Sequence, residues 1–166
     1  MATIDNLKEA FAGESQANRK YLAFAKKAEQ DGYPQVARLF RAAAEAETVH
    51  AHAHLRVIGG VEETAANLEA AVEGEGFEFT QMYPNFIKEA EKEGHKAAIT
   101  SFKFAMAVEE IHHALYREAL KAVQSGKDLP EEKIYICPVC GYTVKGEAPA
   151  SCPVCKTDKK RFFEVK

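Results

Sequence analysis

Two Glu-x-x-His pairs, Glu47 with His50 and Glu109 with His112, interrupt otherwise apolar helical stripes in this chain. Residues three apart lie on the same side of an α-helix, so the carboxylate and the imidazole of each pair can reach one point in space. Burying such groups beneath an apolar face is unfavourable unless something pairs with them, and a metal ion is a common partner. The two pairs therefore predict a metal site built from helices.

Acids on two further predicted helices extend this ligand set. Glu14 lies on the apolar stripe of the first helix, and Glu75 and Glu78 lie three residues apart on the third. Carboxylates combined with imidazole suit iron or manganese, whereas a zinc site normally uses fewer carboxylates. Two ions about 3.5–4 Å apart, bridged by glutamates, would neutralise much of the buried charge. We therefore expect a carboxylate-bridged dimetal site.

The fourth predicted helix offers a second Glu-x-x-His pair one residue later, Glu110 with His113. The stripe in phase with Glu109 and His112 is largely apolar, whereas the stripe in phase with Glu110 and His113 contains several lysine and arginine side chains. An apolar stripe faces the core of a helical protein. We therefore assign the ligands to Glu109 and His112, and we expect His113 at the surface.

Two tyrosines lie where their hydroxyl groups could hydrogen-bond the ligands. Tyr21 lies two turns beyond Glu14 on the same helix face, and Tyr83 lies five residues beyond Glu78. A tyrosine packed in the core, with its hydroxyl satisfied elsewhere, is the alternative for each. We expect both tyrosines to orient metal ligands through hydrogen bonds.

The four cysteines form two Cys-x-x-Cys knuckles, Cys137 with Cys140 and Cys152 with Cys155. Two such knuckles facing each other close a tetrahedral site of four thiolates, which suits zinc or a single iron. Disulfides are the alternative, but the spacing and the expected compartment disfavour them. Zinc would make this site structural, whereas iron would make it a one-electron carrier.

The totals exclude several other classes of protein. The chain has 166 residues, a formal net charge of -3 and no basic stripe, so we expect no nucleic-acid partner. Its apolar runs fall short of the roughly 20 residues that span a bilayer. The N-terminus has neither the basic region nor the apolar core of a signal peptide. We therefore expect a cytoplasmic protein with no membrane partner.

Hydrophobic periodicity predicts helix almost throughout the first 125 residues. Four amphipathic segments are expected, at about residues 5–30, 34–58, 65–93 and 95–124. Pro84 and two glycines disturb the third segment, where we expect a kink or an irregular turn. Four long helices with short connections indicate an antiparallel bundle.

The C-terminal part of the chain has a different character. Residues 131–166 contain all the cysteines, several turn signals and short strand-prone segments, but no amphipathic helix. Residues 134–136 and 161–165 are expected to pair as short β-strands. We therefore predict a helical domain over residues 1–130 and a small four-cysteine module over residues 131–166.

These motifs resemble those of the rubrerythrin family, and the resemblance covers essentially the whole chain. Its most specific elements are Glu14-Ser-Gln-Ala-Asn, Ala46-Glu-Thr-Val-His-Ala, Gly74-Glu-Gly-Phe-Glu, Met82-Tyr-Pro and Val108-Glu-Glu-Ile-His. The general ferritin-like set has one Glu from each of two helices and Glu-x-x-His from the other two. Glu78 is one acid more, which is itself like rubrerythrin. The resemblance implies a ferritin-like di-iron bundle followed by a rubredoxin-like module.

The resemblance also implies a role for each ligand. Glu47 and Glu109 would bridge two iron ions, and Glu14 would be a terminal ligand of the first. Glu75 and His112 would be terminal ligands of the second iron.

Further roles come from the same resemblance. Glu78 would bind the first iron in the oxidised state, and His50 would replace it on reduction. Tyr21 and Tyr83 match tyrosines that hydrogen-bond the ligands in the family. The four cysteines match the ligands of a rubredoxin iron, for which zinc is the alternative occupant.

The activity implied by the resemblance is the two-electron reduction of hydrogen peroxide to water, in defence against oxidative stress. The thiolate-bound iron would return electrons one at a time from an external donor, such as rubredoxin or an NAD(P)H-dependent reductase. Within one chain the module is expected to lie too far from the dimetal site. The resemblance therefore implies a homodimer or higher homo-oligomer, with one subunit's module beside the other's dimetal centre.

The sequence departs from the family pattern at two places. Lys156 stands where the second knuckle usually has a small residue, and the loop between the knuckles is about one residue short.

Two rival functions remain. The first rival is a ferritin-like ferroxidase or iron-handling protein. The second is a non-enzymatic zinc-ribbon interaction module on a helical scaffold.

Overall fold

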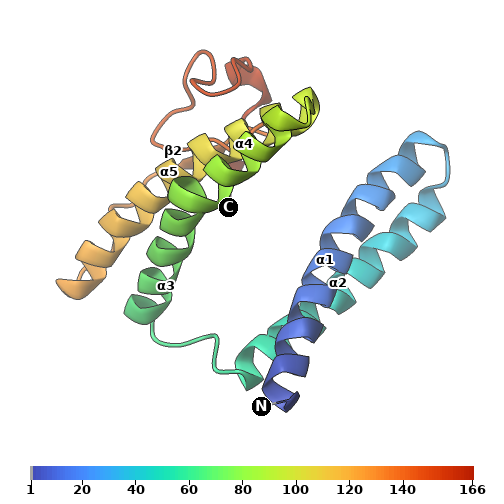
Figure 1. Cartoon of the computed structure of the whole chain (residues 1–166), viewed down its shortest axis with the longest axis horizontal. Coiled ribbons are helices and arrows are strands. Elements are labelled where there is room, and N and C mark those ends of the chain that lie inside the picture. The colour runs from blue at the N-terminus through green and yellow to red at the C-terminus, as the bar shows by residue number, and fades with distance from the viewer. Residues whose placement is uncertain (1) are drawn as a thin grey trace. The chain divides into compact units, whose positions relative to one another are not determined.

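The computed structural model describes residues 2–166, and these fall into two compact units that divide between Glu62 and Glu63. The first unit is a pair of helices, and the second contains three further helices, a short π-helix and a small β-sheet (Figure 1). The predicted fold class, mainly helical with a small four-cysteine module at the C-terminus, is confirmed.

The first unit is an antiparallel hairpin of α1 (Ala2–Gln30) and α2 (Pro34–Val57). Gly32 has a φ of 85°, a left-handed conformation that glycine adopts without strain and that ends the first helix. Pro34 then opens α2, where its missing N–H costs nothing. The sequence therefore specifies this turn, as predicted.

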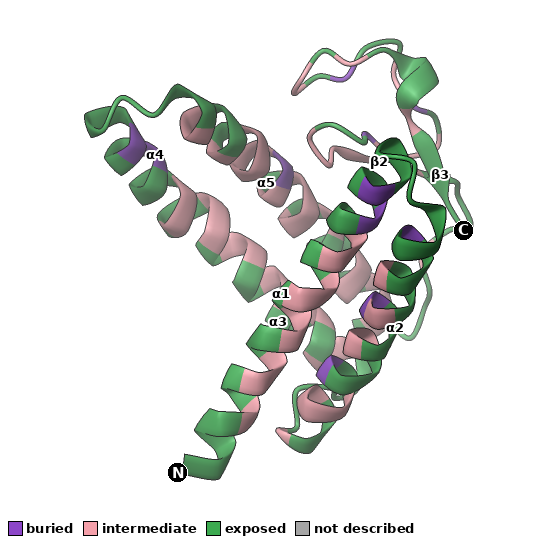
Figure 2. Ribbon diagram, turned by 90° about the vertical axis from the view of Figure 1, so that its right-hand side faces the viewer, coloured by how far each residue is buried: buried purple, intermediate pink, exposed green. Residues whose placement is uncertain are grey.

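Alanines, rather than larger apolar residues, line the most buried face of α2. The buried residues of α2 are Ala37, Ala44 and Ala51, which recur every seven residues along one stripe (Figure 2). The larger apolar residue Leu39 is, in contrast, 69% exposed. The reason is that small alanine side chains let two helices approach closely, so α1 packs on the alanines. On the neighbouring stripe, Phe40 packs against the alanine cluster and the Glu47 side chain is only 18% exposed.

The helices of the second unit also form an antiparallel arrangement. The chain runs through α3 (Thr64–Phe77), the π-helix η1 (Glu78–Met82), α4 (Tyr83–Lys92) and α5 (Lys96–Gln124). The irregularity predicted for this region is thus a π-helix, in which the Tyr83 N–H donates to the Glu78 carbonyl five residues back. Pro84 has no N–H to donate, which favours such a break in the regular pattern.

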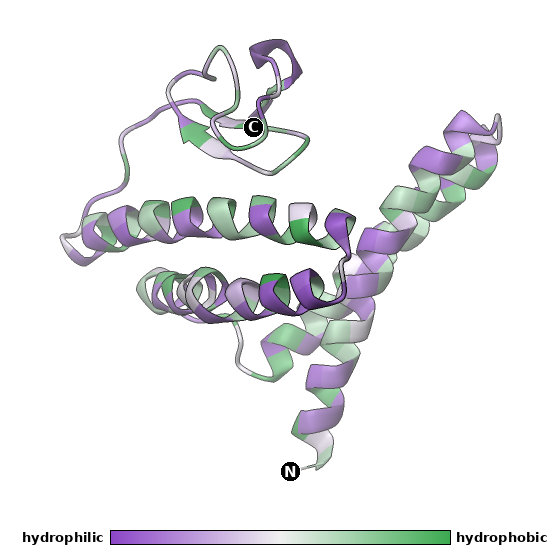
Figure 3. Ribbon diagram, turned by 45° about the horizontal axis from the view of Figure 1, so that its top comes forward, coloured by the Kyte–Doolittle hydropathy of each residue, from purple (hydrophilic) through white to green (hydrophobic). Residues whose placement is uncertain are grey.

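Aromatic side chains join α4 to α5. The ring of Tyr83 lies 6.2 Å from that of Phe102, and the ring of Phe86 lies 5.6 Å from that of Phe102. His95 caps α5 by accepting a hydrogen bond from the Ala98 N–H at 3.2 Å. These contacts fix α4 against the helix that carries Glu109 and His112. Hydrophobic and hydrophilic residues both occur along each of the helices (Figure 3).

The C-terminal module contains a three-stranded antiparallel sheet. Its strands β1 (Ile134–Ile136), β2 (Thr143–Lys145) and β3 (Phe163–Val165) are ordered β2-β1-β3, and a 3-10 helix, η2 (Lys159–Arg161), precedes β3. The predicted pairing is confirmed, since β1 pairs with β3 in the register Ile134 with Val165. Strand β2 was not predicted, since it is only three residues long.

Among residues 2–166, no helix combines the length and the apolar character that crossing a membrane requires.

Candidate metal centres

Three groups of potential metal ligands converge within the described residues. In each group the donor atoms lie within 4.8 Å of one another. The groups are Glu14, Glu47 and His50; Glu75, Glu109 and His112; and Cys137, Cys140, Cys152 and Cys155. Ten of the eleven predicted ligands fall in these groups, and the eleventh is Glu78.

The first group lies in the α1–α2 hairpin. His50 Nδ1 is 2.9 Å from Glu47 Oε2 and 3.9 Å from Glu14 Oε1. Asn18, one turn after Glu14, ties the two helices together beside the group. Its Nδ2 donates to the Ala44 carbonyl at 2.7 Å and to Thr48 Oγ1 at 2.8 Å. The sequence shows Asn18 only as part of the motif that begins at Glu14, and the motif does not predict this link between the helices.

The second group lies between α3 and α5 and has nearly the same geometry. His112 Nδ1 is 2.9 Å from Glu109 Oε2 and 3.9 Å from Glu75 Oε1. Burial, followed by the hydrogen bond and the charge of Glu109, raises the pKa of Glu75 to about 7. Burial likewise raises the pKa of Glu109. Two carboxylates held together away from water need a shared proton or a cation, so this donor set fits a metal ion.

The charges of the second group act on Glu78 and Tyr83. Burial, followed by the charge of Glu75, raises the pKa of Glu78. Burial, followed by the charges of Glu78, Glu109 and Glu75, raises the pKa of Tyr83. Tyr83 is therefore held in its protonated form, as a hydrogen-bond donor. The π-helix between α3 and α4 sets the position of Tyr83 relative to Glu75.

Tyr21 is placed by ring packing in the first unit. Its ring lies 6.3 Å from that of Phe24 and 6.1 Å from that of Phe40. These contacts fit the alternative of a packed tyrosine, and a hydrogen bond from Tyr21 to a ligand stays a prediction.

The alternative pair on α5 separates into two environments. Glu110 is exposed, as expected from its stripe. The expectation that His113 lies at the surface is wrong. His113 Nδ1 is 2.9 Å from the Val72 carbonyl, and its ring packs edge-on against Phe79 at 5.3 Å. Gly76 makes room for this ring, since a side chain there would meet His113 at 3.3 Å. His113 therefore joins α5 to α3.

The four cysteines have the geometry of a tetrathiolate site. Cys137 Sγ lies 3.5 Å from Cys155 Sγ, and Cys140 Sγ lies 3.5 Å from Cys152 Sγ. A disulfide would need about 2.05 Å. A tetrahedron with metal–sulfur bonds of about 2.3 Å has edges of about 3.8 Å, close to the observed separations. All four cysteines are free thiols, so the group fits one zinc or iron ion.

The two knuckles have matching backbone conformations. The Gly141 N–H donates to the Cys137 carbonyl at 2.9 Å, and the Lys156 N–H donates to the Cys152 carbonyl at 3.0 Å. Gly141 has a φ of 86° and Lys156 a φ of 65°. Lys156 thus adopts a left-handed conformation that favours glycine. The departure noted in the sequence therefore leaves the knuckle geometry intact and strains one residue.

Hydrogen bonds tune the sulfur of the second knuckle. Burial alone would raise the pKa of the Cys155 thiol, but hydrogen bonds from the Thr157 hydroxyl and N–H, and then from Cys137 and Cys140, lower it to about 6. The Thr157 hydroxyl lies 3.1 Å from Cys155 Sγ. Burial raises the pKa of Cys140. Cys155 is therefore held as a thiolate, the form that binds metal.

The module lies against α5 of its own chain. His112 Nε2 is 2.9 Å from Thr143 Oγ1 of β2, and Lys145 Nζ is 2.6 Å from Glu118 Oε1. The expectation that one chain's module lies too far from its metal ligands is therefore wrong for the second group. The reason is that the linker after Gln124 lets β2 fold back along α5.

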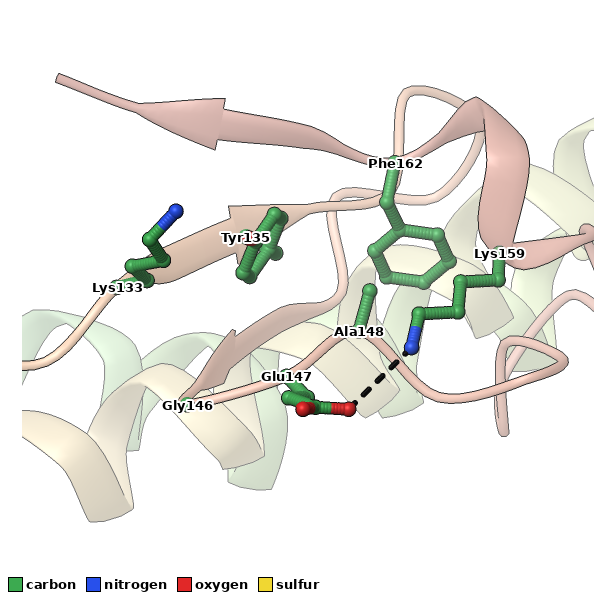
Figure 4. A pocket seen from close by; sticks show the side chains of 7 residues that line it. All are labelled: Lys133, Tyr135, Gly146, Glu147, Ala148, Lys159 and Phe162. Carbon is green, nitrogen blue, oxygen red and sulfur yellow. Dashed lines mark hydrogen bonds and ion pairs between the residues drawn. The ribbon is translucent and has the colours of Figure 1, made fainter.

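A hollow of about 480 Å³ on the module lies apart from these ligands (Figure 4). Its lining contains two lysines, and each is ion-paired. Lys159 lies 3.4 Å from Glu147, and Lys133 lies 3.0 Å from Glu164. Because none of its lining residues is a candidate ligand, we assign the chemistry to the three ligand groups.

Fold and site together define a class of protein. Helices that present Glu and His to a metal, joined to a tetrathiolate module, are typical of non-haem di-iron proteins with an attached electron-transfer site. The comparisons with known proteins narrow this class. The rubrerythrin family model matches residues 5–120, and the model of the rubrerythrin rubredoxin-like domain matches residues 135–163.

Relatives match over nearly the full length. Rubrerythrin-2 of Clostridium acetobutylicum is 36% identical over 174 residues, which cover 96% of this chain and 95% of that protein. Nigerythrin of Nitratidesulfovibrio vulgaris is 38% identical over 175 residues, which cover 97% and 85%. A solved structure of nigerythrin in a mixed-valence state superposes with a TM-score of 0.57 at 36% identity, covering 98% of this chain and 86% of that chain.

The chain belongs to the rubrerythrin family. Its cofactor sites are accordingly a di-iron site of glutamates and histidines and a rubredoxin-like iron site of four cysteines.

Proposed function

We propose that this chain is a peroxidase that reduces hydrogen peroxide to water, in defence against oxidative stress in the cytoplasm. One observation carries the proposal: the four-cysteine module packs on α5 against His112, a residue of the second ligand group. A tetrathiolate iron so placed can supply electrons to the carboxylate site. A site that only stored iron would not need this supply.

The two carboxylate–histidine groups divide the ligands evenly between the two units, with two glutamates and one histidine each. From the resemblance to the family, we propose that the residues of these groups, Glu47 and Glu109 among them, would hold the di-iron centre. When bound, the two irons supply the electron pair that peroxide reduction needs and Lewis acidity toward the O–O bond. Tyr83, whose pKa is raised by burial and by the nearby glutamates, is proposed to donate a hydrogen bond at this centre.

Glu78 and His50 are proposed to exchange as ligands with the redox state. Carboxylate suits the more highly charged ferric ion, and neutral imidazole suits the ferrous ion. The side chain of His50 is 55% exposed, so it has room to move, and it already lies 2.9 Å from Glu47. Glu78 leads the π-helix, an irregular segment of the kind often found at functional sites.

Electrons are proposed to come from rubredoxin or an NAD(P)H-dependent reductase, to pass through the four-cysteine iron, and to reach the di-iron centre one at a time. We also propose that the chain works as a homodimer or higher homo-oligomer. The intrachain contact of the module with α5 supports electron transfer without a partner's module. The case for an oligomer therefore rests on the family resemblance rather than on distance.

The rival function is a ferroxidase, in which the same centre oxidises Fe(II) for storage. The test compares NADH-coupled peroxide reduction with aerobic Fe(II) oxidation, both measured on the all-iron protein with a rubredoxin and its reductase. We expect peroxide turnover to exceed Fe(II) oxidation by at least about tenfold in initial rate. Negligible peroxide turnover beside rapid Fe(II) oxidation would overturn the proposal. A colourless protein as isolated, with zinc on the cysteines, would favour the zinc-ribbon alternative.

A further inference from the structure

The hydroxyl of Thr143 touches the imidazole of His112 across the contact between the module and α5. Thr143 Oγ1 lies 2.9 Å from His112 Nε2, and the two residues are 31 positions apart in the chain. No motif in the sequence singles out Thr143. Its hydroxyl nevertheless bonds directly to a residue of the second ligand group.

The surrounding hydrogen bonds fix the direction of this one. Thr143 Oγ1 donates its own hydrogen to the Gly141 carbonyl at 3.1 Å, so its oxygen is free to accept. His112 Nε2 must then carry the hydrogen. In that tautomer Nδ1 has a lone pair for a metal ion, and its 2.9 Å contact with Glu109 Oε2 needs either a hydrogen on the Glu109 carboxyl or a cation between the two atoms.

The contact is sheltered on its other side. A cavity of about 370 Å³ lies beside His112 and Thr143, and most of its lining is aliphatic, including Leu68, Leu115 and Ile134. Lys145, two residues after Thr143, pairs with Glu118 on α5 at 2.6 Å and holds β2 in place. A hydrogen bond in such apolar surroundings is stronger than one in water.

We propose that Thr143 is a positioning residue for His112, so that the module of a chain orients a metal ligand on its own helix α5. The Thr143 oxygen holds the Nε2–H tautomer and turns Nδ1 toward the glutamates. A histidine that ligates metal generally donates its other N–H to such a partner, and losing the partner weakens metal binding. The proposal rests on His112 being a ligand and does not depend on peroxidase activity.

The test uses the full-length protein loaded with zinc and its variant Thr143→Val, which keeps the side-chain shape and removes the hydroxyl. Long-range proton–nitrogen NMR spectra show which tautomer His112 adopts and how fast its Nε2–H exchanges. Competition with a chelator measures the affinity for zinc at the carboxylate site, after the zinc bound by the cysteines is subtracted. In Thr143→Val we expect loss of the slowly exchanging Nε2–H and roughly 10–100-fold weaker zinc binding at the carboxylate site. Thr143→Ser is expected to restore both.

Two controls separate the hydroxyl from general effects. Thr100→Val removes an exposed hydroxyl that bonds only its own helix, at the Lys96 carbonyl, and should change neither readout. Lys145→Gln removes the ion pair that holds the module and should change zinc affinity less than about twofold. Unchanged Nε2–H exchange and zinc affinity in Thr143→Val would overturn the proposal. Equal losses in Thr143→Val and Lys145→Gln would also overturn it, since docking alone would then explain them.

Discussion

The raised pKa of the Glu75 carboxyl group indicates that its surroundings favour a bound cation. It lies beside Glu109 and His112, and burial with the neighbouring acid raises its pKa to about 7. In the metal-free chain, a proton on Glu75 neutralises the charge that a metal ion would otherwise balance. The ionised Glu75 therefore carries a stability cost above about pH 7, which a bound metal ion would offset.

This cost predicts a pH dependence for the metal-free protein. The pKa of Glu75 is higher in the folded than in the unfolded chain, so its stabilising contribution is complete below about pH 4.5 and is lost as pH rises through about 7. Glu75→Gln should make the metal-free protein more stable at pH 8 by about 1 kcal/mol, after allowance for solvent screening, and leave pH 4 nearly unchanged. Urea unfolding at the two pH values measures this.

The exposed Glu73 of the same helix provides the control, since Glu73→Gln should change the stability at neither pH 4 nor pH 8. Equal effects of Glu75→Gln at pH 4 and pH 8 would contradict the assignment.

The choice between adjacent glutamates on α5 makes a second prediction. Glu109 bonds His112 at 2.9 Å, whereas Glu110 is exposed. Glu109→Ala should abolish loading of the carboxylate site, and Glu110→Ala should leave it at the level of the unmodified protein. Iron analysis of both variants, after subtracting the iron on the cysteines, measures this. The reverse pattern would show that the helix-face assignment is wrong.

At this scale the sequence predicted most of the candidate ligands, because helical spacing and cysteine spacing are local properties. It did not predict the partners of those ligands. Asn18 bonds Ala44 and Thr48 on another helix, and Thr143 bonds His112 from the module. Such pairs depend on how separate elements pack, which local periodicity does not contain. His113 was misplaced for the same reason.

Among the elements, the second knuckle carries local strain. Lys156 has a φ of 65°, where a side chain costs about 1–2 kcal/mol, and glycine would avoid this at a smaller entropic cost. Lys156→Gly should therefore stabilise the module by about 0.5–1 kcal/mol. Loss of the tetrathiolate visible absorbance in urea measures this. Lys160→Gly, in η2, should destabilise or have no effect. A lower urea midpoint for Lys156→Gly would contradict the strain argument.

The elements show where pattern-based prediction succeeds and where it stops. Strong signals such as Gly32 before Pro34 gave correct helix ends, and the β1–β3 pairing was correct. The fully buried residues of α2 are alanines, whereas the larger Leu39 is exposed, because close packing of α1 on α2 favours small side chains over large apolar ones. The π-helix was expected only as an irregular turn, since its type depends on backbone hydrogen bonds around Pro84.

At the scale of the whole molecule, neither unit alone contains all the predicted carboxylate and histidine ligands. Each unit contains one converging group of two glutamates and one histidine, and apolar side chains such as Leu39 and Phe77 stay exposed. Covering such surface is a common reason for assembly. We therefore expect a dimer or higher oligomer at micromolar concentration, measured by light scattering after size-exclusion chromatography. A monomeric mass with a fully loaded di-iron centre would contradict the expected oligomer.

The central claim is that electrons reach peroxide from the four-cysteine iron through the carboxylate site. The most direct measurement mixes the anaerobically reduced all-iron protein with hydrogen peroxide in a stopped-flow instrument and follows the red ferric tetrathiolate absorbance. We predict fast recovery of that absorbance, with one peroxide consumed per two electrons, and at least about 100-fold slower recovery in Glu109→Ala. Equal rates in the two proteins would contradict the account, because peroxide would then oxidise the thiolate iron without the carboxylate site.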